Sequence, residues 1–155
     1  MRATAILGII FTVVALVAAG VPSRAGPQLA PIEIRLVAQR PQGGPVLAVG
    51  GTDRTLEVEA ETLLGPGDFA GAGDVEWTEG KPGFDVALTA SGAAKYERVS
   101  TQNVGRTLAI IVDGKILMTP KILDPVRAQG FLLTMDDAGE AARLAAGVRQ
   151  AIARD

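Results

Sequence analysis

The feature that most constrains the fold of this chain is the dipeptide Asp113-Gly114, which stands between two apolar runs. A two-residue type I′ turn needs positive φ at both central residues, and Asp-Gly adopts that conformation readily. The run at 107–112 is apolar after its first residue, as in a strand that is buried on both faces. We therefore predict a central strand at 107–112, a tight turn at Asp113-Gly114 and a return strand at 115–118.

Further strands are predicted where apolar and polar residues alternate, or where short apolar runs lie between turn residues. The segment 32–38 alternates through Leu36 and is typical of a half-buried strand. The segments 75–78 and 84–88 form a second predicted hairpin, joined by residues 79–83. The remaining strand candidates are 46–49, 55–59 and 130–133, and the Gly-rich stretch 63–73 is predicted to be a loop with a brief helical turn.

A first helix is predicted from Ser91, a residue type that favours the N-cap position. Ala93, Tyr96 and Val99 recur on one face of this helix, at the spacing of an amphipathic helix. Gly105 suits the position just past its end, where positive φ is common.

A second helix is predicted near the C-terminus, after Thr134 and Asp137, which have the spacing of a capping box. Strands precede and interleave with the two helices, so the pattern favours an α+β class. We expect a mainly antiparallel sheet with the two principal helices packed on one face. The apolar stripe of the second helix consists of Ala141, Leu144, Ala145, Val148 and Ile152.

The first 25 residues have the pattern of a secretory signal peptide. Arg2 precedes an apolar run at 6–21, and small residues at 23 and 25 favour a cut before Gly26. The alternative is an uncleaved anchor, although 16 residues fall short of the ~20 that span a membrane comfortably. We predict a signal peptide or anchor at 1–25, a linker at 26–31 and one domain at 32–155. Either alternative places this domain outside the cytoplasm, as a periplasmic or secreted protein, with any membrane attachment limited to an uncleaved N-terminal segment.

The composition excludes several classes of function. The chain has no cysteine and no histidine, so it lacks the commonest ligands of transition metals and the usual general base. We therefore expect no metal, no cofactor and no enzymatic activity. The formal net charge of −2 argues against binding to nucleic acid.

Three groups of residues still need a functional or a structural interpretation. The segment 65–70 satisfies G-x-G-x-x-A, but no long helix follows it, so a plain loop is favoured over a nucleotide site. Asp136 and Asp137 form a carboxylate pair, and their place at a helix N-terminus favours a capping role. Trp77 and Tyr96 are the large amphipathic aromatic residues, and each is either a core-edge residue or an anchor for a bound peptide.

Residues 91–146 carry a succession of motifs that together resemble a known family. A Gly-Ala helix leads to an Asn-x-Gly turn, then to an L-A-I-x-x-D-G-K strand, a proline and a Thr-capped helix with an E-A-x-x-L-A motif. These residues are Gly92-Ala93, Asn103, Gly105, Leu108-Ala109-Ile110, Asp113-Gly114-Lys115, Pro120, Thr134, Glu140-Ala141 and Leu144-Ala145. The pattern resembles the head subdomain of the first periplasmic domain of SecD, an accessory subunit of the Sec protein-export machinery. Upstream, 33–37 resembles the family's E-F-R-L-V strand.

The resemblance implies a SecD-head-like fold and contact with non-native or translocating polypeptide, with Sec components as candidate partners. The multi-helix membrane part of the family has no counterpart in these 155 residues, so we expect a stand-alone domain without motor activity. None of the matching residues is implied to be catalytic, since they build turns, caps and core. Two alternatives stay open at this point: a subunit that docks on one folded partner, and a small-ligand or cell-wall binding domain.

Overall fold

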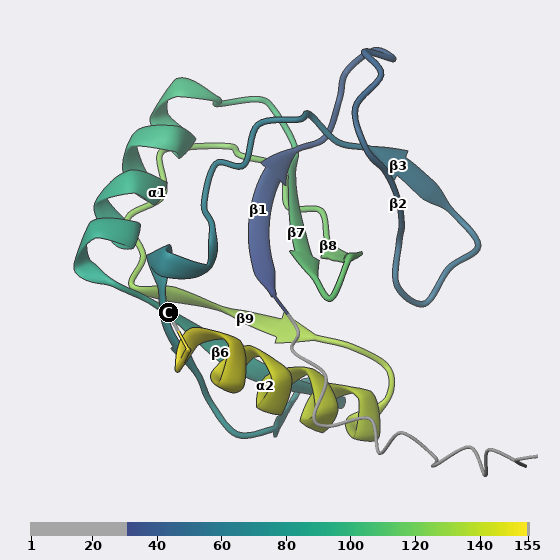
Figure 1. Cartoon of the computed structure of the whole chain (residues 1–155), viewed down its shortest axis with the longest axis vertical. Coiled ribbons are helices and arrows are strands. Elements are labelled where there is room, and N and C mark those ends of the chain that lie inside the picture. Colours follow the sequence, from purple (N-terminus) through teal and green to yellow (C-terminus); the bar gives the residue numbers. More distant parts are fainter. Residues whose placement is uncertain (1–30, 155) are drawn as a thin grey trace, which may run out of the picture.

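The computed structural model describes residues 31–154. The predicted signal peptide at 1–25 and the linker up to residue 30 lie outside these residues. Antiparallel strands and two α-helices make up the described part (Figure 1), which confirms the α+β class. The elements are β1 (Ile32–Leu36), β2 (Val46–Ala48), β3 (Thr55–Glu57), the 3₁₀ helix η1 (Pro66–Asp68), β4 (Phe69–Ala72), β5 (Glu76–Thr78), β6 (Lys81–Leu88), α1 (Ala90–Gln102), β7 (Leu108–Val112), β8 (Lys115–Met118), β9 (Gly130–Thr134) and α2 (Ala138–Ile152).

The predicted hairpin of β7 and β8 is confirmed. Asp113 and Gly114 have φ angles of 53° and 73°, as a type I′ turn requires. The strand β7 lies between β1 and β8, and both pairings are antiparallel. All five residues of β7 are buried, because one face packs into the main core and the other into a second cluster. This second cluster contains Val58 and Ile116 and lies against the β2–β3 hairpin.

A second sheet is built around β6, which pairs with β4 and β5 along one edge and with β9 along the other. The side chains of Phe84, Val86 and Leu88 alternate towards the main core, whereas Asp85 and Ala87 are exposed on the opposite face. Both helices contribute buried residues to the same core and contact β6. The strands are thus divided among separate antiparallel sheets, and the helices pack on the core-facing side.

The predicted connection at 79–83 is wrong in length. The turn consists of Glu79-Gly80 alone, both with positive φ, and β6 already begins at Lys81. Pro82 therefore lies inside a strand rather than in a loop, near its first residue, where a missing N–H is tolerated. Part of the predicted loop at 63–73 is also strand: β4 pairs with β6 and places the Phe69 side chain in the core.

The N-cap of the first helix lies two residues before the predicted cap at Ser91, and the helix itself begins at Ala90. The Thr89 hydroxyl accepts a hydrogen bond from the Gly92 N–H at 3.0 Å, so Thr89 is the N-cap of α1. Threonine and serine both suit the N-cap position, so the residue types alone do not show whether Thr89 or Ser91 caps the helix. Thr89 does so because the chain turns into the helix directly after β6 ends at Leu88. The predicted buried face is confirmed for Tyr96 and Val99.

The capping role predicted for Thr134 is also wrong. Thr134 is the last residue of β9, and Asp137 alone caps α2, since its Oδ1 accepts from the Glu140 N–H at 2.6 Å. The capping interpretation of Asp137 is thereby confirmed. Within residues 31–154, neither helix is both long and apolar enough to cross a membrane.

The hairpin turn gives a direct test of the fold. A Cβ added at Gly114 would meet no atom within 4 Å, so a substitution there changes only the backbone preference. Gly114→Val should lower the free energy of unfolding by about 1–2 kcal/mol, because a β-branched residue resists positive φ. Gly114→Asn is the matched control and should cause a smaller loss, since asparagine tolerates this region. Equal melting temperatures for wild type and Gly114→Val would contradict the assigned turn.

Glu57 makes the loop before β2 sensitive to acid. Its Oε1 accepts hydrogen bonds from the N–H groups of Gln42 at 2.7 Å and Gly44 at 2.9 Å. These bonds hold the pKa of Glu57 below its ordinary value, so the stabilisation is present above the unfolded pKa, about 4.3. It is lost as the pH falls through the lower pKa of the folded state. Glu57→Gln should remove the part of the pH dependence of unfolding that comes from this carboxylate. Titration of the amide chemical shifts of residues 42 and 44 measures the ionisation of Glu57 in the wild type.

Candidate functional site

The outer edge of β9 presents backbone groups that no other strand of the described residues uses. The Leu88 N–H donates to the Gln129 carbonyl at 2.7 Å, and the Met135 N–H donates to the Pro82 carbonyl at 3.0 Å. Odd-numbered residues of this segment therefore face β6, and the even-numbered ones face away from it. The N–H and C=O groups of Gly130, Leu132 and Thr134 make no backbone hydrogen bond within residues 31–154. We call these three residues the β9 edge.

On the opposite edge of the same sheet, a side chain from α2 covers the end of β4. Arg149 Nη1 donates to the Gly73 carbonyl at 2.6 Å and to the Ala72 carbonyl at 3.3 Å. It also lies 3.4 Å from the Asp74 carboxylate. A charged side chain over a strand edge prevents another strand from pairing there. The two edges thus differ, since no charged side chain of the described residues contacts the backbone of the β9 edge in this way.

A pocket of about 330 Å³ lies at the C-terminal end of the β9 edge. Its apolar lining comes from Leu117 and Met118 at the end of β8 and from Met135 just after β9. The Gly50-Gly51 turn forms a further part of the wall. The arrangement has room for a side chain carried by a strand placed along β9.

The mouth of this pocket is acidic. Asp136, Asp137 and Glu140 line it together with a single base, Lys81. The Lys81 ammonium lies 2.9 Å from Asp136 Oδ1, and both side chains are largely exposed. Asp137 is engaged by the backbone of α2 as its cap. Within the described residues, no group of three or more acidic side chains is arranged to hold a metal ion.

The two aromatic residues predicted as peptide contacts differ in accessibility. Trp77 is 69% exposed and lies on β5, directly across from Pro82. Tyr96 is only 7% exposed, and its ring lies 6.4 Å from that of Phe131 in the core. Burial also raises the pKa of Tyr96. Tyr96 is therefore a core residue in this fold, whereas Trp77 stays a candidate contact.

Three residues of the family motif, Asn103, Gly105 and Pro120, make hydrogen bonds at the end of α1 and in the segments that follow it. Asn103 is the C-cap, and its side-chain amide donates to the Val99 carbonyl at 2.9 Å. Gly105 has a φ of 87°, and its N–H donates to the Ile122 carbonyl. The Pro120 carbonyl accepts from the Leu108 N–H. These contacts end α1 and join the segment after it to the residues around β7.

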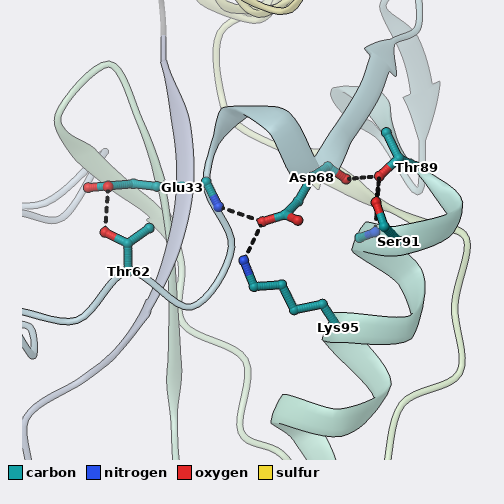
Figure 2. A network of polar contacts seen from close by, with 8 residues as sticks. Glu33, Thr62, Asp68, Thr89, Ser91 and Lys95 are labelled. Carbon is teal, nitrogen blue, oxygen red and sulfur yellow. Dashed lines mark hydrogen bonds and ion pairs between the residues drawn. The ribbon is translucent and has the colours of Figure 1, made fainter.

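The G-x-G-x-x-A segment at 65–70 supports α1 rather than a nucleotide. The Asp68 carboxylate accepts from the Gly65 N–H and from Lys95 Nζ, each at 2.9 Å. Figure 2 shows the contact between Lys95 and Asp68. The Asp68 carbonyl in turn accepts from Thr89, the N-cap of α1. The Gly65 N–H that a bound phosphate would need is thus occupied by a carboxylate, which argues against a nucleotide site. The segment is not the predicted plain loop, however, since it forms η1 and the start of β4.

The family whose pattern is described as "SecDF, P1 head subdomain" matches residues 47–152 of this sequence, which is more than half of the chain. The chain belongs to this family. The resemblance predicted from the motifs is thereby confirmed, and membership associates the domain with protein export.

Relatives of known name agree with this assignment. The chain is 36% identical over 89 residues to protein translocase subunit SecD of Thermobaculum terrenum. It is 33% identical over 88 residues to protein translocase subunit SecDF of Thermus thermophilus, and 31% identical over 90 residues to SecD of Acidaminococcus fermentans. These matches cover 56–57% of this chain and 12–22% of the relatives, so the chain spans less than a quarter of their length.

Two solved structures share the fold. One is SecDF in its Super-membrane-facing form, with a TM-score of 0.61 and 24% identity over 79% of this chain and 19% of that one. The other is described as a membrane component SecDF that enhances protein export, with a TM-score of 0.63 and 23% identity over 79% of this chain and 63% of that one. They support the SecDF P1 head fold described above.

The sequence predicted β9 as a strand but not the β9 edge as a site. Gly130 and Leu132 belong to no motif, Thr134 is predicted as a helix cap, and no local pattern reveals that one side of a strand lacks a neighbour. The closing contact of Arg149 is equally hidden, because its carbonyl partners lie 76 and 77 residues away in the sequence.

Proposed function

We propose that this P1 head domain binds extended polypeptide outside the cytoplasm by adding it as a strand to the β9 edge. The observation that carries the proposal is the row of outward backbone groups at Gly130, Leu132 and Thr134, which have no backbone partner within residues 31–154. A chain in β conformation pairs with such an edge through its own backbone, so it needs no particular sequence. The family's association with protein export supplies a setting in which unfolded chains occur.

The binding is passive in this proposal. The domain holds a segment without nucleotide, proton gradient or covalent chemistry, and it catalyses no reaction. Affinity should lie in the micromolar range, because ordering an extended chain consumes much of the contact energy. Sec components are the candidate partners that hand over or receive the polypeptide.

The test is a titration of the purified protein against a secretory protein in its reduced, unfolded form and in its native form. We expect saturable binding to the unfolded form and none to the native form, because only an extended chain offers backbone groups to the β9 edge. Equal binding to both forms, or binding to neither, would contradict the proposal.

Docking on one folded partner is the second candidate function. Val104 and Leu123 are 50% and 72% exposed, and the hydrogen bond from Gly105 to Ile122 holds their two segments together. An exposed apolar pair of this kind favours a protein contact. A small-ligand site has less support, since Trp77 and Tyr96 line none of the four best-formed pockets of residues 31–154, whose volumes are roughly 200–400 Å³.

A further inference from the structure

We infer that the β9 edge prefers extended segments in which basic residues directly precede the apolar strand-forming residues. The inference rests on the proposed strand addition and names the class of polypeptide that this site selects. It depends on three features: the direction of β9, the apolar pocket at one end of it, and the acidic mouth of that pocket.

The direction of β9 fixes which end of a bound segment meets the pocket. Each of the sheets in the described part is built from antiparallel pairs, so we take the added strand to run antiparallel to β9. The chain of β9 runs from Gly130 towards Thr134, and Thr134 lines the pocket. The N-terminal residues of an antiparallel ligand therefore lie at the pocket, and its later residues extend back towards Gly130.

The pocket gives this end of the ligand an apolar contact. Leu117, Met118 and Met135 are all partly buried and pack against the main core, and together they form the apolar wall of the pocket. One apolar side chain of the ligand can leave water here, next to its first backbone hydrogen bonds with Thr134. Methionine side chains adapt to ligands of different shape, which suits a site that accepts many sequences.

The acidic mouth selects the charge of the residues that precede this contact. Three carboxylates and one ammonium line the pocket, which leaves a formal charge of −2 from 3 acids and 1 base. Lys81 is paired with Asp136, whereas Glu140 makes no ion pair with another described residue. A lysine or arginine at the start of the ligand is attracted to this surface, and a glutamate is repelled. Asp136, Asp137 and Lys81 are exposed and Glu140 is half-buried, so the preference is modest and falls with added salt.

The test uses the purified protein and three peptides with blocked termini. The first has two lysines ahead of an alternating valine–threonine segment, the second has glutamates in place of the lysines, and the third carries the lysines at its C-terminal end. We expect the first peptide to bind about fivefold more tightly than either of the others at low salt. At high salt, the three affinities should converge.

A double variant locates the source of the preference. Asp136→Asn with Glu140→Gln should remove the difference between the three peptides, while the shared affinity for all of them remains. Glu76→Gln, an exposed carboxylate on β5, is the matched control and should leave the difference unchanged. A melting curve of each variant establishes that it is folded.

The outcomes separate this inference from the proposed function. Equal binding of the three peptides to the wild type at low salt would overturn the charge preference and leave strand addition standing. A preference that survives in the double variant would also overturn it. No binding of any peptide would overturn both the inference and the proposed function.

Discussion

Gly92→Ala should lower the free energy of unfolding by roughly 1–3 kcal/mol, although alanine is the better helix former. A Cβ at this position would overlap the Asp68 carbonyl oxygen, and backbone at residue 68 is the obstacle rather than a movable side chain. The same carbonyl also accepts hydrogen bonds from Thr89, the N-cap of α1. Moving η1 away from an added Cβ would therefore break these bonds as well. Figure 2 shows how closely Asp68 lies to the first turn of α1.

The matched control is the same chemical change made next to Asp68. A Cβ at Gly67 would meet no atom within 4 Å, and Gly67 does not have positive φ. Gly67→Ala should leave the stability unchanged or raise it by a few tenths of a kcal/mol. Chemical denaturation of the two variants measures both values. A Gly92→Ala protein as stable as the wild type would show that α1 does not need this close approach.

Leu132→Pro should weaken binding of an unfolded chain at least tenfold, which corresponds to about 1.4 kcal/mol. Proline removes the outward N–H at the middle of the β9 edge and places its ring where the added strand would lie. The hydrogen bonds between β6 and β9 are kept, because the N–H and C=O groups of Leu132 point away from β6. The change therefore acts on the open side of the strand.

Leu132→Ala is the control, since it removes the same side chain but keeps the N–H donor. It should bind within about twofold of the wild type, because a strand edge is recognised through its backbone. Thr134→Pro gives a second disruption of the edge if the first variant does not fold. If both proline variants fold and bind as the wild type does, while Trp77→Ala loses binding, the polypeptide contacts β5 and not the β9 edge.

The parts of the fold that sequence predicts well depend on neighbouring residues. Asp113-Gly114 determines its hairpin through two φ angles, and the apolar stripe of α2 is visible at helical spacing. The family motif Gly92-Ala93 can also be found in the sequence, but the sequence does not show why residue 92 has to be a glycine. Gly92 is required by the carbonyl of Asp68, which lies in a different element, so no local pattern reveals it.

The parts that sequence predicts poorly are decided by competition between elements. Thr134 has a residue type that suits a helix cap, but pairing with Gly83 draws it into β9. Phe69 lies among glycines that indicate a loop, yet its burial against the core makes β4 a strand. The candidate site depends on the same kind of information, because an open edge is defined by the absence of a neighbour within the described fold.

The measurement that tests the central claim most directly is amide hydrogen exchange of the purified protein with and without a bound strand-forming peptide. Phe131 and Leu133 already face β6 and serve as internal references within the same strand. We predict that binding slows exchange at Leu132 and Thr134 and leaves the two references unchanged. Protection confined to Trp77 or Val104, with no change at Leu132 and Thr134, would contradict strand addition at the β9 edge.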